Sequence, residues 1–371
     1  MQTDILIVGG GISGSLCAFV LASIGMKVTL VEKSRIGSGS SAAQTGLLMY
    51  KSDKLLCELI CEIGEERAVK FYRMCLEAME EFSSISTMLN EEAGYRKRDS
   101  IYYASSDEDV EKLRREYACL SKHAFPAEYL SGEELKERYG IDKAGAIRTW
   151  NDADINPGRF IRAITKKNIE LGVRCYENTE IELDKIEDGR AVTGDGCIID
   201  FEHIVLATGY SEIYPVIRDK CSITRTYAFC SETVGGKLWK DEAMVWETKT
   251  PYLYFRTTQD RRIVGGGKDE DIEVLEKDRD KIYAKAEAIA KEIEGILPWL
   301  DIKVSHAWNA IFATSKDGIP FIGQDPSKPY KYYLLGYEGN GTCYSMAGAL
   351  IIKDLILGKS NPYADIVRVD R

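Results

Sequence analysis

The sequence has no apolar run of the ~18–20 residues that a membrane-spanning helix needs. It also lacks the basic region that opens a secretory signal peptide, because it begins with Asp4 and a short apolar run that suits the first strand of a fold. Lysine and arginine form no stripe, and the formal net charge is −10, which argues against nucleic acid or an anionic membrane surface as the main partner. We therefore expect a cytoplasmic protein without a membrane span.

Groupings of metal-binding or nucleophilic side chains are also scarce. None of the ten cysteines forms a C-x-x-C pair, so we expect free thiols that mostly pack as small buried residues. Cys57 and Cys61 lie four residues apart in an expected helix, but no histidine or third cysteine is near them. The three histidines, His123, His203 and His306, are scattered. The sequence therefore predicts no metal site and gives little support to a nucleophilic triad.

The sequence does contain a glycine-rich motif near its N-terminus. Gly9, Gly11 and Gly14 follow an apolar run at residues 5–8 and lead into an expected helix over residues 13–25. A second strand is expected at residues 27–31, and Glu32 stands at its end, 18 residues after Gly14. This order of strand, glycines, helix, strand and acid is typical of a βαβ unit that binds a dinucleotide.

Each residue of this motif has a physical role. Gly9 permits the tight turn, Gly11 lets the backbone approach a pyrophosphate, and Gly14 lets the helix pack against the sheet. The free N–H groups at the start of the helix and its dipole favour the negative charge of the pyrophosphate. Glu32 suits both hydroxyls of a ribose and would repel a 2′-phosphate, so NADP is not expected at this site.

The remaining chain predicts a nucleotide-binding domain assembled from separated pieces. Its 371 residues suit two domains, and its composition, 44% hydrophobic and 29% charged, is that of a soluble globular protein. Helices are expected over residues 53–90, 107–122, 131–139 and 274–296. Strands are expected at residues 173–181, 191–199, 204–209, 224–233 and 332–335, with a further strand-rich block over 244–267. The blocks that show antiparallel alternation fit a second domain threaded through the first.

Several short motifs occur in an order that resembles one known family. They are Gly9–Gly14 with Glu32, Gly37–Leu47, Asp154–Phe160, Val205–Gly209, Tyr252–Arg256 with Gly265–Asp269, Asp317–Gly323 and Gly336–Gly341. Over nearly its whole length the chain resembles the FAD-dependent oxidoreductases of the D-amino-acid oxidase, glycine oxidase and sarcosine oxidase family. The resemblance implies an α/β (α+β) protein of two domains: a glutathione-reductase-type FAD-binding Rossmann domain and a discontinuous antiparallel-sheet substrate domain. We assign residues 1–84, 148–218 and 305–371 to the first domain, and residues 85–147 and 219–304 to the second.

The same resemblance implies a set of residues for non-covalently bound FAD. The ADP half is expected at Gly9, Gly11, Gly14, Glu32 and Lys33. The pyrophosphate, ribityl chain and flavin are expected along Ser40, Ser41, Gln44, Thr45 and Gly46, with Ala207, Thr208 and Gly209 near the pyrophosphate and the backbone of Ile181 at the adenine. Backbone N–H groups of Gly339, Asn340, Gly341 and Thr342 are expected near the flavin N1–C2 edge, where the reduced ring is anionic and such donors stabilise it.

The best candidates for contact with substrate lie on one expected strand. Tyr252, Tyr254 and Arg256 share one face of it, and Leu253 and Phe255 share the other. Two phenols and a guanidinium suit a polar or carboxylate-bearing substrate, because the guanidinium binds a carboxylate through two hydrogen bonds. The alternative, weighed about evenly, is a structural arginine paired with an acid such as Glu247.

The sequence departs from the family at three positions. Residues 308–316 contain no arginine to hold a substrate carboxylate, which puts a simple α-amino acid in doubt, although Lys316 is a possible substitute. Ala310 stands near the position where some relatives attach the flavin through cysteine. Ile263 falls near the position of the oxygen-activating lysine of sarcosine oxidases, so a dehydrogenase with another electron acceptor is an alternative to an oxidase. Lys268 is a weaker candidate for a cation near the flavin.

The leading hypothesis is an FAD-dependent oxidoreductase that oxidises the C–N bond of a small amine or amino acid by hydride transfer to flavin N5. Three alternatives stay open: an NAD-linked dehydrogenase, an FAD-binding sensor or complex subunit without amine turnover, and a relative that oxidises an alcohol such as glycerol phosphate. The NAD-linked alternative predicts none of the later motifs. The substrate, the electron acceptor and the oligomeric state are not indicated by the sequence.

Overall fold

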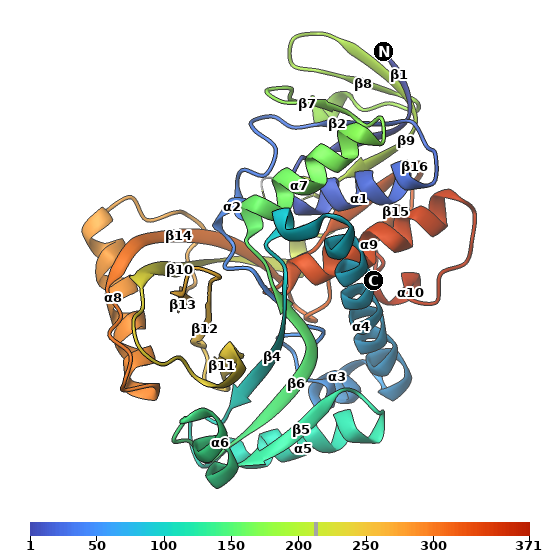
Figure 1. The fold of residues 1–371 in the computed structure, drawn as a ribbon. Coiled ribbons are helices and arrows are strands. Elements are labelled where there is room, and N and C mark those ends of the chain that lie inside the picture. The colour runs from blue at the N-terminus through green and yellow to red at the C-terminus, as the bar shows by residue number, and fades with distance from the viewer. Residues whose placement is uncertain (211–213) are drawn as a thin grey trace.

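The computed structural model describes residues 1–210 and 214–371 of the chain, and in that part it forms two sheets with helices packed on both (Figure 1). The first sheet has seven strands. Its order is β15 (Phe321–Asp325), β16 (Lys328–Leu335), β9 (Ile198–Leu206), β1 (Gln2–Val8), β2 (Val28–Val31) and β7 (Arg174–Tyr176), with β8 (Arg190–Val192) paired to β9. The strands from β16 to β7 are parallel, and β15 and β8 add antiparallel partners. This is the Rossmann-type sheet expected from the N-terminal motif.

The second sheet has nine strands and lies beside the first. Its order is β14 (Val304–Ser315), β10 (Cys221–Thr233), β13 (Arg262–Glu270), β12 (Tyr254–Thr257), β11 (Met244–Glu247), β4 (Arg96–Tyr103), β6 (Gly145–Asp154) and β3 (Leu47–Leu48), with β5 (Ala127–Ser131) paired to β6. All the pairs are antiparallel except β11 with β4, so the expected antiparallel sheet has one parallel pair at its middle.

Sheet membership differs from the expected domain boundaries at three places, of which β3 is the first because it pairs with β6. Strand β6 continues the second sheet as far as Asp154, and strand β14 belongs to the same sheet up to Ser315. The expected boundaries place residues 148–154 and 305–315 in the nucleotide-binding domain. Each of these strands therefore crosses from its expected domain into the second sheet.

The helices follow the expected positions with local changes. They are α1 (Ile12–Ser23), α2 (Ser40–Ala43), α3 (Leu56–Ile63), α4 (Glu65–Met88), α5 (Asp109–Lys122), α6 (Gly132–Tyr139), α7 (Pro157–Glu170), α8 (Arg279–Ile296), α9 (Gly341–Ile356) and α10 (Ala364–Val367). The single helix expected over residues 53–90 is divided at Gly64, whose φ of 84° interrupts the helical backbone. Helix α8 begins later than expected, because Asp278 caps it at residue 279.

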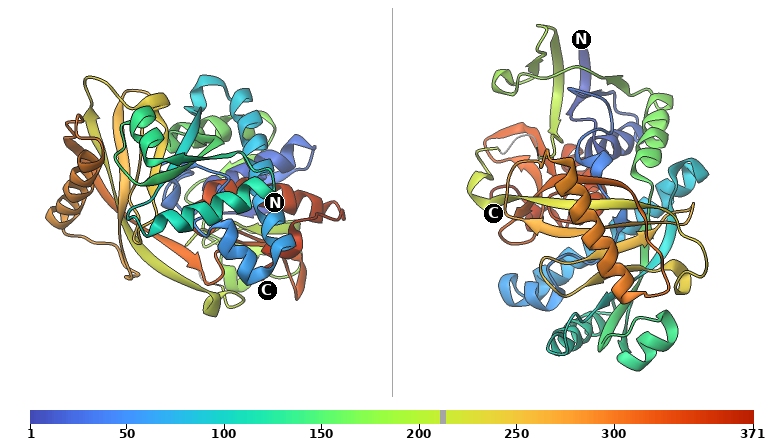
Figure 2. Two further views of the ribbon diagram at one scale, coloured as in Figure 1. Left: turned by 90° about the horizontal axis from the view of Figure 1, so that it is seen from below. Right: turned by 90° about the vertical axis from the view of Figure 1, so that its left-hand side faces the viewer.

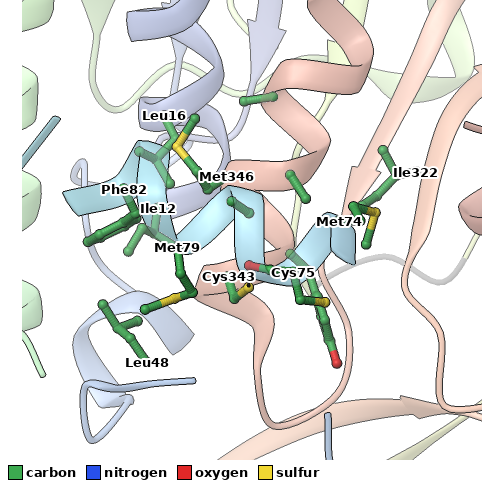
Figure 3. Packing of buried hydrophobic residues seen from close by; sticks show 14 of the residues in the cluster. Ile12, Leu16, Leu48, Met74, Cys75, Met79, Phe82, Ile322, Cys343 and Met346 are labelled. Carbon is green, nitrogen blue, oxygen red and sulfur yellow. Dashed lines mark hydrogen bonds between the residues drawn. The ribbon is translucent and has the colours of Figure 1, made fainter. Parts of the chain in front are cut away.

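Buried hydrophobic side chains of the described residues form three clusters, and the third packs on the other face of the first sheet through Leu6, Val31 and Leu206. In the nucleotide-binding domain, α1, α4 and α9 pack through Leu16, Met79 and Met346, and the Cys343 thiol donates to the Cys75 carbonyl at 3.5 Å (Figure 3). In the other domain, α8 lies across the nine-stranded sheet (Figure 2) and buries Ile289 and Ile293 against it. Burial of these apolar faces is the main stabilising contribution to each domain. Among the described residues, no helix combines the length and apolar character needed to cross a bilayer.

Candidate functional site

The glycine motif forms a tightly packed turn between β1 and α1. Gly9 has a φ of 108°, and a Cβ there would stand 2.3 Å from the Ala207 carbonyl oxygen. A Cβ on Gly14 would stand 1.9 Å from the carbonyl oxygen of Gly9, so the close contact at Gly14 is with the turn itself. Gly11 is the N-cap of α1 and supplies no side-chain cap. The start of α1 therefore combines its dipole with a backbone that a ligand can approach closely.

Glu32 lies beside this turn, at the end of β2. Its two carboxylate oxygens accept hydrogen bonds from the backbone N–H groups of Gly10 and Ser34, both at 2.8 Å. The neighbouring Lys33 is exposed. The Thr179 N–H donates to the Glu32 carbonyl at 2.9 Å, which places the segment leading to Ile181 next to the acid. The structure thus brings together the residues expected at the ribose and the adenine.

The segment from Ser40 to Gly46 joins the two halves of the site. The Ser41 hydroxyl accepts the N–H of Ile12 at 2.9 Å, and the Gln44 side chain accepts the Thr342 hydroxyl at 2.9 Å. Gly46 has a φ of 78°, and a Cβ on it would stand 2.3 Å from the Ile155 carbonyl oxygen. Helix α2 is therefore fixed against the start of α1, and the residues after it against the start of α9.

The N-terminal turns of α1 and α9 lie side by side. Their Ser13 and Ser345 hydroxyls are 2.7 Å apart, and the N-cap Asn340 uses its side chain on the carbonyls of Met49 and Lys51 instead of capping α9. Asn340 is 3% exposed, and its Oδ1 has no hydrogen-bond partner among the described residues. Two positive helix ends at one place suit a ligand with a pyrophosphate and an anionic ring.

One expected donor is already engaged. The N–H of Gly339 donates to Oδ2 of Asp53 at 2.8 Å, so it does not point freely toward a flavin. A Cβ on Gly339 would stand 2.6 Å from the same oxygen, and a Cβ on Gly341 would stand 2.4 Å from the Gly336 carbonyl oxygen. The Gly339 N–H is thus paired with an acid that lies 286 residues earlier in the sequence, and its expected role near a flavin stays a prediction.

The residues after β9 line the other side of the turn. The N–H of Ala207 donates to the Val8 carbonyl at 2.8 Å, and the Ala207 carbonyl is the group that Gly9 packs against. The Thr208 hydroxyl lies 2.8 Å from the Tyr214 hydroxyl, and Gly209 has a φ of 60°. This segment stands next to the start of α1, as the resemblance implied.

On the second sheet, the expected division of faces is confirmed. Leu253 and Phe255 pack in the core beneath α8, while Tyr252 and Tyr254 lie on the opposite face with ring centroids 5.8 Å apart. Arg256 shares the tyrosine face but is 4% exposed and donates to three carbonyl oxygens, of Thr45 at 2.6 Å, Thr257 at 2.8 Å and Ile155 at 2.9 Å. These contacts favour the structural alternative for Arg256, and the acid beside it is Asp154, whose Oδ1 lies 4.0 Å from the Arg256 Nη1, and not Glu247.

Three carboxyl groups near the tyrosines were missed by the sequence reasoning. Burial raises the pKa of Asp53, raises the pKa of Asp269 to about 6 and raises the pKa of Glu338 to about 7. Asp53 also contributes to the higher pKa values of the other two through like-charge repulsion. Asp269 ends the Gly265–Asp269 motif and Glu338 precedes Gly339, so their places in those motifs were the available signals.

The remaining candidates lie away from the site. Ile263 packs in the core beneath α8. Lys268 pairs with Glu292 of α8, and Lys316 is exposed. Trp308 does face the nucleotide-binding domain, since its indole N–H donates to the Ala43 carbonyl at 2.8 Å. In the described part of the chain, no three histidine, cysteine or carboxylate side chains are grouped to hold a metal ion.

Comparisons with known proteins agree with this geometry. The family model described as FAD dependent oxidoreductase (DAO) matches residues 4–355. The chain is 22% identical to the probable oxidoreductase OrdL of Haemophilus influenzae, over 96% of this chain and 83% of that protein. It is 23% identical to glycine oxidase of Geobacillus kaustophilus, over 97% and 94% of the two chains. The crystal structure of L-proline dehydrogenase from P. horikoshii has the same fold, with a TM-score of 0.82, 21% identity and coverage of 100% and 97%.

Proposed function

Because the chain belongs to the DAO family of FAD-dependent oxidoreductases, we propose that it oxidises the C–N bond of an amine or amino acid. The match over residues 4–355 is the observation that carries this proposal. A glycine oxidase and an L-proline dehydrogenase, which both act on amino acids, are among its similar proteins. The NAD-linked alternative does not account for a family match that extends so far beyond the N-terminal motif.

The residues at the domain junction fit FAD bound without a covalent link. The glycine turn and the start of α1 would hold the pyrophosphate, where a Cβ on Gly9 or Gly14 would collide with backbone. Glu32 would bind the ribose of the ADP half. Residues 40–46 and the start of α9 would hold the ribityl chain and the flavin, with Asn340, Gly341 and Thr342 at the anionic end. Ala310 offers no thiol for a covalent attachment.

Bound FAD would supply the two-electron, hydride-accepting chemistry that the oxidation of a C–N bond requires. The protein has to orient the substrate and keep the site dry. Tyr252 and Tyr254 are placed to do both, because their rings line the face of the second sheet that is turned toward the nucleotide-binding domain. Their buried hydroxyls stay protonated, since burial holds the pKa of each phenol well above its ordinary value.

The alcohol alternative with a phosphate-bearing substrate is disfavoured. Asp53, Asp269 and Glu338 stand near the two tyrosines, and a phosphate there would meet three acids. Among the described residues, Arg256 and Lys268 are engaged elsewhere, and Lys51, whose Nζ has no hydrogen-bond partner, lies over the rings of Tyr102 and Trp246. A neutral or cationic amine meets no such repulsion.

Anaerobic titration of the purified yellow protein tests the proposal. Amines, N-methyl amines, and D- and L-amino acids are added in turn, and the absorbance of the oxidised flavin is followed. Bleaching by at least one compound is expected, and readmission of air then separates an oxidase from a dehydrogenase. A yellow protein that none of the compounds bleaches contradicts the proposal and favours an FAD-binding protein without amine turnover.

A further inference from the structure

Asp269 is directed toward the site by an irregularity of β13. Between β10 and β13, Arg225 pairs with Glu270 but Tyr227 pairs with Gly267, so β13 has one extra residue at this point. Lys268 takes a left-handed φ of 59° there and turns outward to Glu292. The bulge sends the next side chain, Asp269, to the opposite face, where it lies against Thr226.

The carboxyl group of Asp269 is incompletely satisfied. Its Oδ1 is buried and has no hydrogen-bond partner among residues 1–210 and 214–371. A buried carboxylate oxygen without a donor is costly, and such an atom in a native site indicates a group that binds there. The Tyr252 and Tyr254 phenols lie close enough for the Asp269 charge to raise the pKa of both.

Asp53 faces the same tyrosines from the other domain. It accepts the Gly339 N–H at 2.8 Å and a hydrogen bond from Tyr252. Asp53 and the Tyr252 hydroxyl both lie within 3.0 Å of the position that a Cβ on Gly339 would take, and the Tyr254 ring centroid is 5.8 Å from that of Tyr252. The charge of Asp53 also contributes to the raised pKa of Asp269. Glu338, 6% exposed, is the third acid and is held by the N–H and hydroxyl of Ser315.

The nearby cations are all directed elsewhere. Arg256 donates to backbone carbonyls, and Lys268 pairs with Glu292. Arg225 and Lys285 pair with Glu270, which belongs to the outward face. Lys51 is 1% exposed and lies over the rings of Tyr102 and Trp246, at 4.4 and 5.0 Å from their centroids. None of these side chains forms an ion pair with Asp53 or Asp269 in the described part of the chain.

On the same face of the sheet, the described residues of β10 and β14 next to Thr226 also include no basic side chain. Thr226 pairs with Ala310 and Thr224 pairs with Phe312 across β10 and β14. The side chains of Ala310 and Phe312 therefore lie on the same face of β14 as Trp308, which is turned toward the nucleotide-binding domain. A substrate carboxylate would therefore meet aromatic and aliphatic side chains and two acids. A protonated nitrogen would instead meet two carboxylates and several aromatic rings, which is the environment that binds an ammonium group.

We propose that the substrate carries a second, protonated nitrogen in place of a carboxylate, and that Asp269 and Asp53 bind it. This proposal rests on the proposed function, because it names the substrate class of the same site. The second nitrogen stays charged and anchors the molecule, while the nitrogen that is oxidised lies near the flavin as a neutral amine. Asp269 and Asp53 are thus specificity-determining residues of the reaction.

Three probes of equal chain length test this assignment on the FAD-loaded protein. They are 1,4-diaminobutane, butylamine and 4-aminobutanoate, whose far ends are cationic, neutral and anionic. Binding is measured by equilibrium dialysis under anaerobic conditions, and flavin bleaching is recorded in the same samples. The diamine is expected to bind at least about tenfold more tightly than butylamine, and 4-aminobutanoate least of the three.

Variants that each remove one carboxylate charge test which residues produce the tighter binding of the diamine. Asp269→Asn should reduce the advantage of the diamine over butylamine about tenfold, and Asp53→Asn should act in the same direction. Asp271→Asn, which removes an exposed acid two residues along the chain, is the matched control and should change neither constant. If Asp269→Asn does not fold, the ranking of the three probes on the parent protein still shows whether the site prefers a cationic far end.

The outcomes separate this inference from the proposed function. Butylamine or 4-aminobutanoate binding as tightly as the diamine overturns the inference, whether or not any probe bleaches the flavin. An advantage of the diamine that survives both Asp→Asn changes overturns the assignment to these residues. Failure of every amine to bleach the flavin contradicts the proposed function alone, since the dialysis still measures the preference.

Discussion

The backbone N–H of Gly339 donates a 2.8 Å hydrogen bond to the carboxylate of Asp53, joining the loop before α9 to the segment that follows β3. The same carboxylate accepts from Tyr252 on the second sheet. Asp53 therefore connects the nucleotide-binding domain, the flavin-side loop and the substrate-side tyrosines. The structural and the substrate-binding consequences of this contact are separable by substitution.

Replacing Asp53 by alanine should destabilise the protein more than replacing it by asparagine. Alanine leaves the Gly339 N–H without its acceptor, whereas asparagine retains an acceptor oxygen. We expect the free energy of unfolding to fall by about 1–3 kcal/mol for Asp53→Ala and by clearly less for Asp53→Asn. Urea denaturation of both variants measures the difference. Equal losses would show that the charge of Asp53, and not its acceptor, holds the loop.

Gly14→Ala should abolish FAD binding, because its Cβ would stand 1.9 Å from the Gly9 carbonyl oxygen. The turn must open to admit the methyl group, which moves the start of α1. Gly295→Ala is the matched control: it lies in α8 with no heavy atom within 4 Å of its Cβ position and should gain about 0.5–1 kcal/mol from better helix propensity. The flavin-to-protein absorbance ratio of the purified variants gives the result. Normal flavin content in Gly14→Ala would contradict this geometry.

Arg256→Lys should impair folding and flavin retention without a selective effect on substrate binding. Lysine cannot reproduce three hydrogen bonds to the separated carbonyls of Thr45, Thr257 and Ile155. A loss of about 2–4 kcal/mol in the free energy of unfolding is expected. Denaturation and steady-state kinetics on the FAD-saturated variant are the measurements. A large rise in KM with unchanged stability would restore the carboxylate-binding alternative.

The free energy of unfolding should depend on pH through Glu338. Burial raises the pKa of this carboxyl group from 4.5 to about 7. Since the folded state holds this proton more firmly than the unfolded state, stability is greatest below about pH 4.5 and falls as the pH rises to about 7. Glu338→Gln keeps an acceptor for Ser315 and removes the ionisation. The variant should therefore gain stability relative to the parent as the pH rises from 5 to 7.5, by up to about 3 kcal/mol.

Urea unfolding of both proteins without added FAD measures this difference at each pH. If the difference in unfolding free energy between variant and parent stays constant from pH 5 to 7.5, Glu338 ionises normally in the folded protein. If the stability advantage of the variant instead grows as the pH falls, the sign of the proposed linkage is reversed.

Much of the nucleotide-binding half was predictable because its signals are local. The turn at Gly9, the helix after Gly11 and the acid at Glu32 lie within one βαβ unit, where steric limits and helix electrostatics act between near neighbours. The alternation of Tyr252 to Arg256 likewise follows from strand geometry alone. Even here, the division of the helix at Gly64 and the crossing of β6 and β14 between domains depended on packing, which local periodicity does not contain.

The sequence by itself determined the βαβ unit, the ordered motifs that indicate an FAD-dependent oxidoreductase, and the absence of an arginine on β14. Only the tertiary structure decided which partners the polar groups take. Gly339 turned to Asp53, Arg256 to backbone carbonyls and Lys268 to Glu292, each across a long separation in sequence. Partner choice is a competition among all groups that the fold brings within hydrogen-bonding distance, and desolvation makes each unpaired group costly. That competition also gathered the acids beside the tyrosines, although Asp269 and Glu338 lie in or next to motifs that the sequence shows.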